Sequence, residues 1–323
     1  MSGFGRRLQQ GVIIPSAPTN PPGPPGTYKP DSSNTGYAYT NVTLIPHNGD
    51  YNITTDGTTL DSLDISGWVV VNAANVTIKR CYVRGGAAKS FNTALIDCTA
   101  ANCSNVVVQD CLLVPDQPTL WYDGIIGHDY TIQRCEIYHT VDGCGVYNTH
   151  NNGGAVNTNI YANYIHSLAG YLVDPNHSNG PTHNDCIQPQ GGNNVQIIGN
   201  NLLGFVSSTV GSGASWNDGN GEFAGSNGTG GLHTNSCIQL NQNTADVTSG
   251  LVINNNWADG AHIAFNLAVG PPSAHINSIK NNQFGANTSG ALQINLRSTT
   301  TLGVMSGNVF EADGSPVTIH TNA

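Results

Sequence analysis

Charged side chains are scarce in this sequence. Asp, Glu, Lys and Arg make up 9% of the 323 residues, against about 25% in an average globular protein. The 10 basic residues are outnumbered by 20 acidic ones, for a formal net charge of −10, and no Lys or Arg lies between Cys135 and Ile279. A negative chain with few basic groups repels phosphate, so we expect no nucleic-acid partner.

Long apolar runs and paired cysteine motifs are also missing. No run of 18 or more apolar residues occurs, so we expect no membrane insertion. Near the N-terminus only residues 11–14 form an apolar stretch, which is too short for a secretory signal. The eight cysteines include no CxxC pair, so they suggest neither a zinc site nor a disulfide framework. We expect reduced cysteines in the core.

What the sequence has in abundance is Asn, Gly and an internal repeat. The repeated unit is a short strand of alternating apolar residues, a turn, and then Cys or Asn. It recurs at residues 75–83, 105–113, 129–137, 157–165, 195–203, 251–258, 276–284 and 302–310. The final positions are Cys81, Cys111, Cys135, Asn163, Asn200, Asn256, Asn282 and Asn308. The step of 56 residues from Asn200 to Asn256 fits either two turns or one turn with a large insertion.

A second strand family alternates with the first. It occupies residues 94–98, 123–127, 142–148, 184–190, 235–241, 261–266, 291–296 and 316–320, with apolar side chains at every second position. Short strands recurring without a crossover helix predict a parallel β-helix, in which each coil stacks about 4.8 Å from the last. Asn side chains at equivalent positions would hydrogen-bond along the stack, and Cys81, Cys111 and Cys135 would fill the same column.

The pattern resembles the right-handed parallel β-helix of the pectate-lyase-like superfamily, and it is most similar to minor tail or tail-spike proteins of actinobacteriophages. The fold class expected is therefore all-β, with the β-helix spanning residues 55–323. Residues 1–30, which hold seven of the 16 prolines between residues 15 and 30, form an extended arm, and residues 31–54 form a connector or cap. Resemblance to tail spikes implies a homotrimer, a virion location, and an arm that contacts other tail proteins.

Two insertions interrupt the repeat, at residues 168–182 and 206–234. Long loops on a solenoid are often functional. Trp216 in the second insertion is a candidate for stacking on a sugar ring. Asp218, Asn220 and Glu222 alternate as Ca²⁺ ligands can, but the remaining ligands of a calcium loop are missing, so we expect no cofactor.

Candidate catalytic residues lie in the second strand family. Residues 141–143 and 184–187 are similar to two polygalacturonase motifs, and residues 231–233 to a third, although Asn184 replaces an Asp of that family. The resemblance implies Asp142 and Asp185 as an inverting acid and base, assisted by His233. His183, two residues before Asp185, is an alternative acid–base partner. The alternative is a purely structural role, in which Asp185 only accepts backbone hydrogen bonds at a turn.

Uncharged amides dominate the other predicted binding surface. With so few basic residues nearby, an acidic polysaccharide is a poor ligand, but a strip of outward amides would suit the hydroxyls of a neutral glycan. The strip consists of Gln188, Gln239, Asn241, Asn266, Gln293 and Asn295. The sequence thus favours a phage tail component that binds host-surface glycan. The alternatives are a glycoside-hydrolase-like depolymerase acting on a neutral glycan and a purely structural tail protein.

Overall fold

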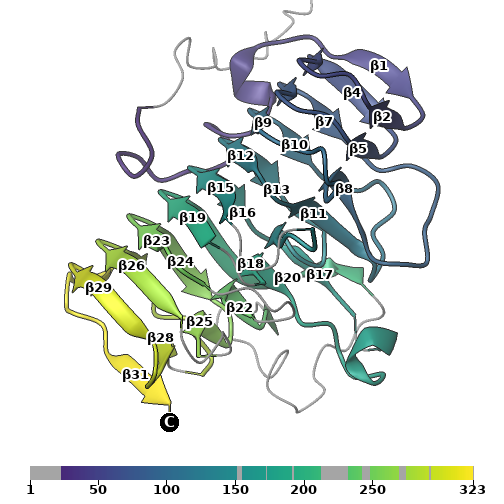
Figure 1. The fold of residues 1–323 in the computed structure, drawn as a ribbon. Helices are drawn as coiled ribbons and strands as arrows, with labels where there is room; N and C mark the ends of the chain where they lie inside the picture. The colour runs from purple at the N-terminus through teal and green to yellow at the C-terminus, as the bar shows by residue number, and fades with distance from the viewer. Residues whose placement is uncertain are drawn as a thin grey trace, which may run out of the picture.

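Parallel strands wind into a stack of coils, as the repeat predicts (Figure 1). A computed structural model describes residues 23–150, 155–171, 173–190, 193–211, 232–241, 248–268, 274–290 and 292–322. In these ranges the strands make three sheets, called A, B and C here, and each coil contributes one strand to each sheet in turn. Coil 1 holds β1 to β3, coil 2 holds β4 to β6, and so on along the stack.

The strand bounds follow the repeat. Sheet A contains β1 (Ile45–Asn48), β4 (Leu63–Ser66), β7 (Tyr82–Val83), β10 (Leu112–Leu113), β13 (Glu136–Ile137), β16 (Tyr164–Ile165), β20 (Asn201–Gly211), β24 (Trp257–Gly260), β27 (Gln283–Phe284) and β30 (Val309–Phe310), with β17 (Leu168–Gly170) and β21 (Leu232–His233) beside β20. Sheet B contains β2 (Tyr51–Ile53), β5 (Val69–Val71), β8 (Thr93–Cys98), β11 (Tyr122–Gly127), β14 (Cys144–Val146), β18 (Asp185–Pro189), β22 (Ser236–Gln239), β25 (Ile263–Leu267), β28 (Leu292–Arg297) and β31 (Ile319–Asn322). Sheet C contains β3 (Thr59–Asp61), β6 (Thr77–Lys79), β9 (Val106–Gln109), β12 (Tyr130–Gln133), β15 (Ala155–Tyr161), β19 (Asn193–Ile198), β23 (Leu251–Asn254), β26 (His275–Lys280) and β29 (Thr301–Ser306). Two 3-10 turns, η1 (Ala38–Thr40) and η2 (Pro175–His177), complete the elements.

The sequence revealed two strand families, whereas the structure has three sheets. The second family is sheet B, and the first splits into sheet C and most of sheet A at the Cys or Asn position. Several strands of sheet A are only two residues long, such as β7 and β10, so they carry no periodicity of their own. Coil 1 begins at β1, inside residues 31–54, which the sequence assigned to a connector.

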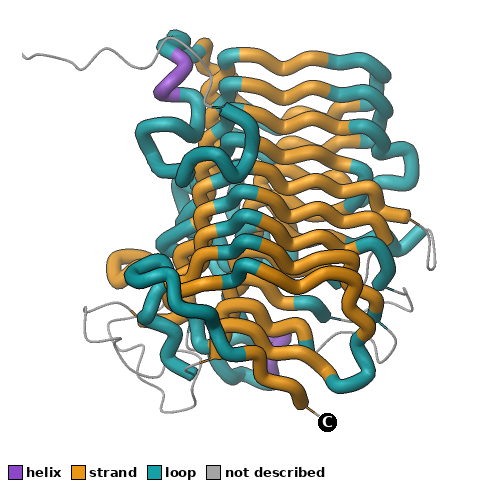
Figure 2. Tube along the Cα trace, turned by 90° about the vertical axis from the view of Figure 1, so that its left-hand side faces the viewer, coloured by secondary structure: helices purple, strands orange, loops and turns teal. Residues whose placement is uncertain are grey.

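One apolar column fills the space between the sheets. Val108, Ile132, Ile160, Ile197 and Ile253 of sheet C are fully buried on successive coils. Their neighbours in sequence are half-buried or exposed, as in the alternating pattern of β9 and β12. The stack seen edge-on in Figure 2 shows these coils lying one above another. Each coil therefore buries the inner face of the next.

The predicted Cys and Asn ladder is confirmed at the turn between sheets C and A. Each side chain accepts a hydrogen bond from the backbone N–H of the equivalent residue in the preceding coil. The Oδ1 atoms of Asn163, Asn200 and Asn256 accept from Cys135, Asn163 and Asn200 at 2.9 Å. Asn200 bonds directly to Asn256 and β20 pairs with β24, so the step of 56 residues is one coil with an insertion. All eight cysteines are buried free thiols.

A strap made of residues 23–41 crosses the outside of sheet A. The Pro30 carbonyl accepts a hydrogen bond from Asn201 at 2.7 Å, and η1 brings Tyr39 onto Asp110. Arg134 donates to both oxygens of Asp110, at 2.6 and 3.0 Å, and so closes a largely buried ion pair under the strap. The stack itself therefore holds the strap, including the end of the proline-rich arm. Residues 1–22 lie outside the described residues.

The Asn ladder should be essential to stability. Asn256→Ala removes the acceptor of the Asn200 N–H and the donor to the Ile197 carbonyl, both buried. Leaving two buried groups unsatisfied should lower the free energy of unfolding by about 2–4 kcal/mol. Denaturant unfolding would measure it, with Asn277→Ala, an exposed position on β26, as the control. Equal stability of the two variants would contradict a role for the ladder.

Candidate functional site: an acidic cleft on sheet B

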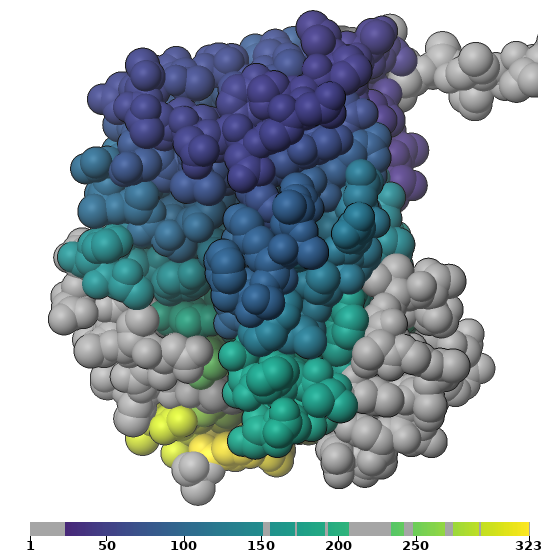
Figure 3. All heavy atoms as spheres, turned by 90° about the vertical axis from the view of Figure 1, so that its right-hand side faces the viewer, coloured from purple at the N-terminus to yellow at the C-terminus, as the bar shows by residue number. Residues whose placement is uncertain are grey.

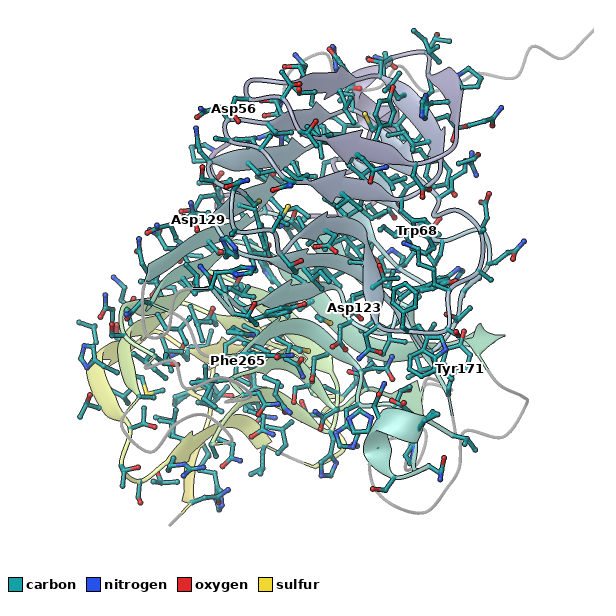
Figure 4. The ribbon with its side chains drawn as sticks, turned by 45° about the vertical axis from the view of Figure 1, so that its right-hand side comes forward. Asp56, Trp68, Asp123, Asp129, Tyr171 and Phe265 are labelled. Atoms are coloured by element: carbon teal, nitrogen blue, oxygen red, sulfur yellow. The ribbon has the colours of Figure 1, made fainter. Side chains whose placement is uncertain are left out.

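A cleft of about 390 Å³ opens on the outside of sheet B. Loops before β8 and β11 supply Asn92, Leu120 and Trp121, and the insertion before β18 supplies another wall. Asp123 and Asp142 lie in the cleft, and no lining residue in the described part of the chain is Lys or Arg. In Figure 4, Asp123 lies on the same side of the stack as Tyr171 and η2 of the insertion.

Three Asp residues occupy the same position on successive coils of sheet B. Asp142 donates its N–H to the Asp123 Oδ1 at 3.2 Å, and Asp185 donates its N–H to the Asp142 Oδ1 at 2.8 Å. The next coil places Ser236 at the equivalent position, and the neighbouring Asn235 donates its Nδ2 to the Asp185 Oδ1 at 3.1 Å. We call Asp123, Asp142 and Asp185 the Asp column. Asp123 and Asp142 each accept a backbone N–H from the following coil, whereas each Asn of the ladder accepts one from the preceding coil.

The glycines after Asp123 and Asp142 explain how closely these coils pack. Gly124 and Gly143 follow Asp123 and Asp142, and a Cβ at either position would lie 2.4–2.5 Å from a carbonyl oxygen of the next coil. The Gly124 N–H donates to the Asp142 carbonyl at 2.9 Å. Glycine thus lets the coils approach at this point, and the Asp-Gly pairs stack in register.

Burial raises the pKa values of the carboxyls in this column. It raises the pKa of Asp123 to about 7, and the N–H of Asp142 opposes that rise. For Asp142, burial and then the neighbouring charges of Asp123 and Asp185 raise the pKa well above its usual range. Burial also raises the pKa of Asp185 to about 7, against His183 and the donors Asn235 and Gln188. Three stacked carboxyls cannot all ionise cheaply, so burial and mutual repulsion favour the protonated form of Asp142.

The column contains more charge than the fold requires. Asn at the equivalent ladder positions accepts the same kind of backbone N–H bond without a titratable group. An uncharged residue, Ser236, occupies the equivalent position in the next coil. Burying three neighbouring carboxyls costs stability whenever they ionise. Hydrogen bonding at a turn therefore explains why an Asn or Asp side chain lies here. It does not explain why that side chain is Asp rather than Asn.

The insertion places two histidines beside the carboxyls. Asp174 is 3% exposed and accepts the Asn176 N–H at 2.8 Å, which caps η2. The same carboxylate lies 2.6 Å from the His177 Nδ1 and so orients that ring. The His177 ring stacks on His183, with centroids 4.0 Å apart. His177 and His183 both line the cleft.

The structure divides the predicted catalytic set. Asp142 faces the cleft and His183 lines it, but Asp185 has no exposed surface and does not line it. The structure therefore does not bring both carboxyls of the expected inverting pair into the cleft, because the Asp185 carboxyl is turned toward the amides of Asn235 and Gln188. For His233 the structure gives only a backbone pairing with Phe205. Trp216, Asp218, Asn220 and Glu222 lie outside the described residues.

The predicted amide strip is also divided. Gln188, Gln239 and Asn241 line the cleft. Asn266, Gln293 and Asn295 do not, and with Gln239 they are at most 8% exposed rather than solvated. The reason is a row of amides bonded along the stack: Asn266 donates to Gln239 at 3.0 Å, and Asn295 donates to Asn266 at 3.2 Å. These amides support the outside of sheet B much as the Asn ladder supports the turn.

Sequence reasoning missed Asp123, Asp174 and His177. A signal for Asp123 was present, because residues 123–127 and 142–148 both begin with Asp-Gly and belong to the same strand family. Nothing in the pattern could place Asp174 and His177, which lie on an insertion without a repeat. Their position depends on how that insertion folds back onto the coils.

Comparisons with known proteins give no identification. No protein-family model, curated protein or solved structure matches the chain. Among the described residues, no helix is long and apolar enough to cross a membrane. Within the same ranges, no three His, Cys, Asp or Glu side chains are grouped as a metal site.

Replacing the column carboxyls by amides should stabilise the protein at neutral and alkaline pH. A raised pKa in the folded state means that stability is fully present below about pH 4 and is lost as pH rises toward the folded-state value. Asp142→Asn and Asp123→Asn keep the hydrogen-bond acceptor but remove this loss. We expect a melting temperature higher by about 2 °C or more at pH 8, and little change at pH 4.

The matched control is Asp56→Asn. Asp56 also accepts a backbone N–H from the next coil, that of Ala74 at 2.9 Å, but it is exposed. Its replacement should change the melting temperature little at either pH. A loss of stability at pH 8 in the Asp142→Asn variant, with the control unchanged, would contradict the buried-charge interpretation.

Proposed function

We propose that this protein is a glycoside-hydrolase-like depolymerase that cleaves a neutral glycan in the cleft on sheet B. The observation that carries the proposal is the stacked pair of Asp123 and Asp142, two carboxyls with raised pKa values in a cleft where Asn would serve the fold. Trp121 and the amides of Gln188 and Asn241 in the same cleft suit the apolar faces and hydroxyls of sugars. The lack of basic lining residues disfavours uronates.

The different pKa shifts of the two carboxyls assign the two roles. Asp142 keeps its proton and acts as general acid, donating it to the glycosidic oxygen as the C–O bond breaks. Asp123, which accepts the Asp142 N–H, is the carboxylate that attacks the anomeric carbon. Adjacent coils are spaced about 4.8 Å apart, a step close to the 5–5.5 Å between the carboxyls of retaining enzymes. Water then hydrolyses the glycosyl ester, and Asp142, now ionised, takes the proton of that water.

The experiment is a polysaccharide panel. Purified protein is incubated with dextran, mannan and arabinogalactan as neutral substrates and with polygalacturonate as the acidic one, and new reducing ends are measured. We expect release from a neutral polymer, none from polygalacturonate, and a loss of about 10³-fold or more in Asp142→Asn and Asp123→Asn. Release that persists in both variants would rule out this pair.

The reaction should depend on pH through the same two groups. Activity needs Asp123 ionised and Asp142 protonated, so kcat/KM should rise with pH up to about 7 and fall again once Asp142 loses its proton. Proton NMR of the first-formed sugar should show a retained anomeric configuration. An inverted product would instead require a water molecule between two more widely separated carboxyls.

Glycan binding without cleavage is the second candidate. It is favoured by the backbone hydrogen bonds that Asp123 and Asp142 already accept, which give each carboxyl a structural role. A binding protein would retain the polymer without releasing reducing ends. Asn241→Ala would then weaken retention, while Asp142→Asn would leave it unchanged.

Either activity fits the phage tail setting that the resemblance implies. In this proposal the right-handed stack is the body of a trimeric tail protein, residues 1–30 join it to other tail proteins, and the cleft meets host-surface glycan. The strap fixes where that arm leaves the body, because Pro30 is bonded to Asn201 on sheet A. Deleting residues 1–22 should leave a folded body that no longer enters particles. Normal incorporation would contradict the anchoring role.

A further inference from the structure

The wall of the cleft formed by residues 168–182 is firmly attached to the coils. Ala169 and Tyr171 pack on Val141 and Leu120 in an apolar cluster separate from the main core. The Asn184 Nδ2 donates to the carbonyls of Val141 and Ala169, at 2.8 and 2.7 Å. Buried contacts of this kind make the insertion a fixed wall rather than a mobile lid.

The tip of this wall reaches back three coils. The Asn176 Nδ2 donates to the Asn92 Oδ1 at 3.1 Å, which joins the insertion before β18 to the loop before β8. Both residues line the cleft. The joint passes beside coils 4 and 5, which carry Asp123 and Asp142. In Figure 3 the insertion, in teal, lies directly against the blue loops of the earlier coils.

The sugar-binding groups lie on the opposite side of the carboxyl pair. Gln188 and Gln190 belong to coil 6, and Gln239 and Asn241 to coil 7, so the amides extend from the carboxyls toward later coils. Toward coil 3 the cleft meets Asn92 and its bond to Asn176. An enzyme that cuts within a chain needs room for sugars on both sides of the bond. Here one side is walled.

We propose that the cleft accepts the end of a glycan chain and releases short products of uniform size, with the body of the chain lying over Gln188 and Asn241. This inference rests on the proposed glycosidase function and adds where along the glycan chain the enzyme cuts. The wall holding Asn176 and Asn92 determines the product length.

The test uses whichever neutral polymer of the panel is cleaved, with products separated by size over time. We expect one short product from the first minutes, while the polymer shortens gradually. Labelling one chain end with a bulky fluorophore should stop cleavage, and labelling the other end should not. A random mixture of fragment lengths, or cleavage unaffected by either label, would overturn the inference while leaving the glycosidase function in place.

Two variants test whether the wall determines the length of the products. Asn176→Ala and Asn92→Ala each remove the joint, and longer products should appear beside the short one. Asn277→Ala, on sheet C, should keep the uniform product. Unchanged product lengths in both joint variants would overturn the role of the wall. If wild type cleaves and retains no polymer of the panel, the proposed function fails, and this inference fails with it.

Discussion

A buried N–H group at each turn of the stack is the constraint on which this structure depends. Where the chain passes from sheet C to sheet A, the N–H cannot reach a backbone carbonyl of the adjacent coil. A side chain from that coil supplies the acceptor instead, as Asn200 does for Asn163 and Asn256 does for Asn200. Because an unsatisfied buried amide is expensive, the position admits few residue types. The ladder thereby fixes the register of every coil against the next.

The outside of sheet B uses the same solution with different chemistry. Asp123, Asp142 and Asp185 accept bonds from the next coil, whereas the Asn ladder accepts them from the preceding one, and the three Asp residues are titratable and share one low-dielectric site. The fold gains nothing from the charge, and ionisation of one carboxyl opposes ionisation of the next. A site that sacrifices stability in order to hold protons is typical of acid–base chemistry. Stability and activity should therefore change in opposite directions at these positions.

Two segments outside the regular coils decide what the stack can contact. The strap covers part of sheet A, and its Tyr39 hydrogen-bonds to both members of the Arg134–Asp110 ion pair. The insertion before β18 walls the cleft on sheet B and brings in Asp174 and His177. Both depend on coils far apart in the chain being adjacent in space. The solenoid thus acts as a rigid frame on which irregular segments shape one accessible surface.

The sequence by itself determined the parallel stack, the ladder from Cys81 to Asn308 and the burial of the apolar column, because each coil repeats a local pattern. It also singled out Asp142 and His183. Only the tertiary structure decided that Asp123 rather than Asp185 shares the cleft with Asp142, and that Asn266, Gln293 and Asn295 are buried. Which side chains meet in the cleft depends on how many residues each turn contains and on the path of an insertion that does not repeat. The alternation of apolar residues encodes neither of these. The side chains that meet are settled by the register between coils, which only the tertiary structure shows.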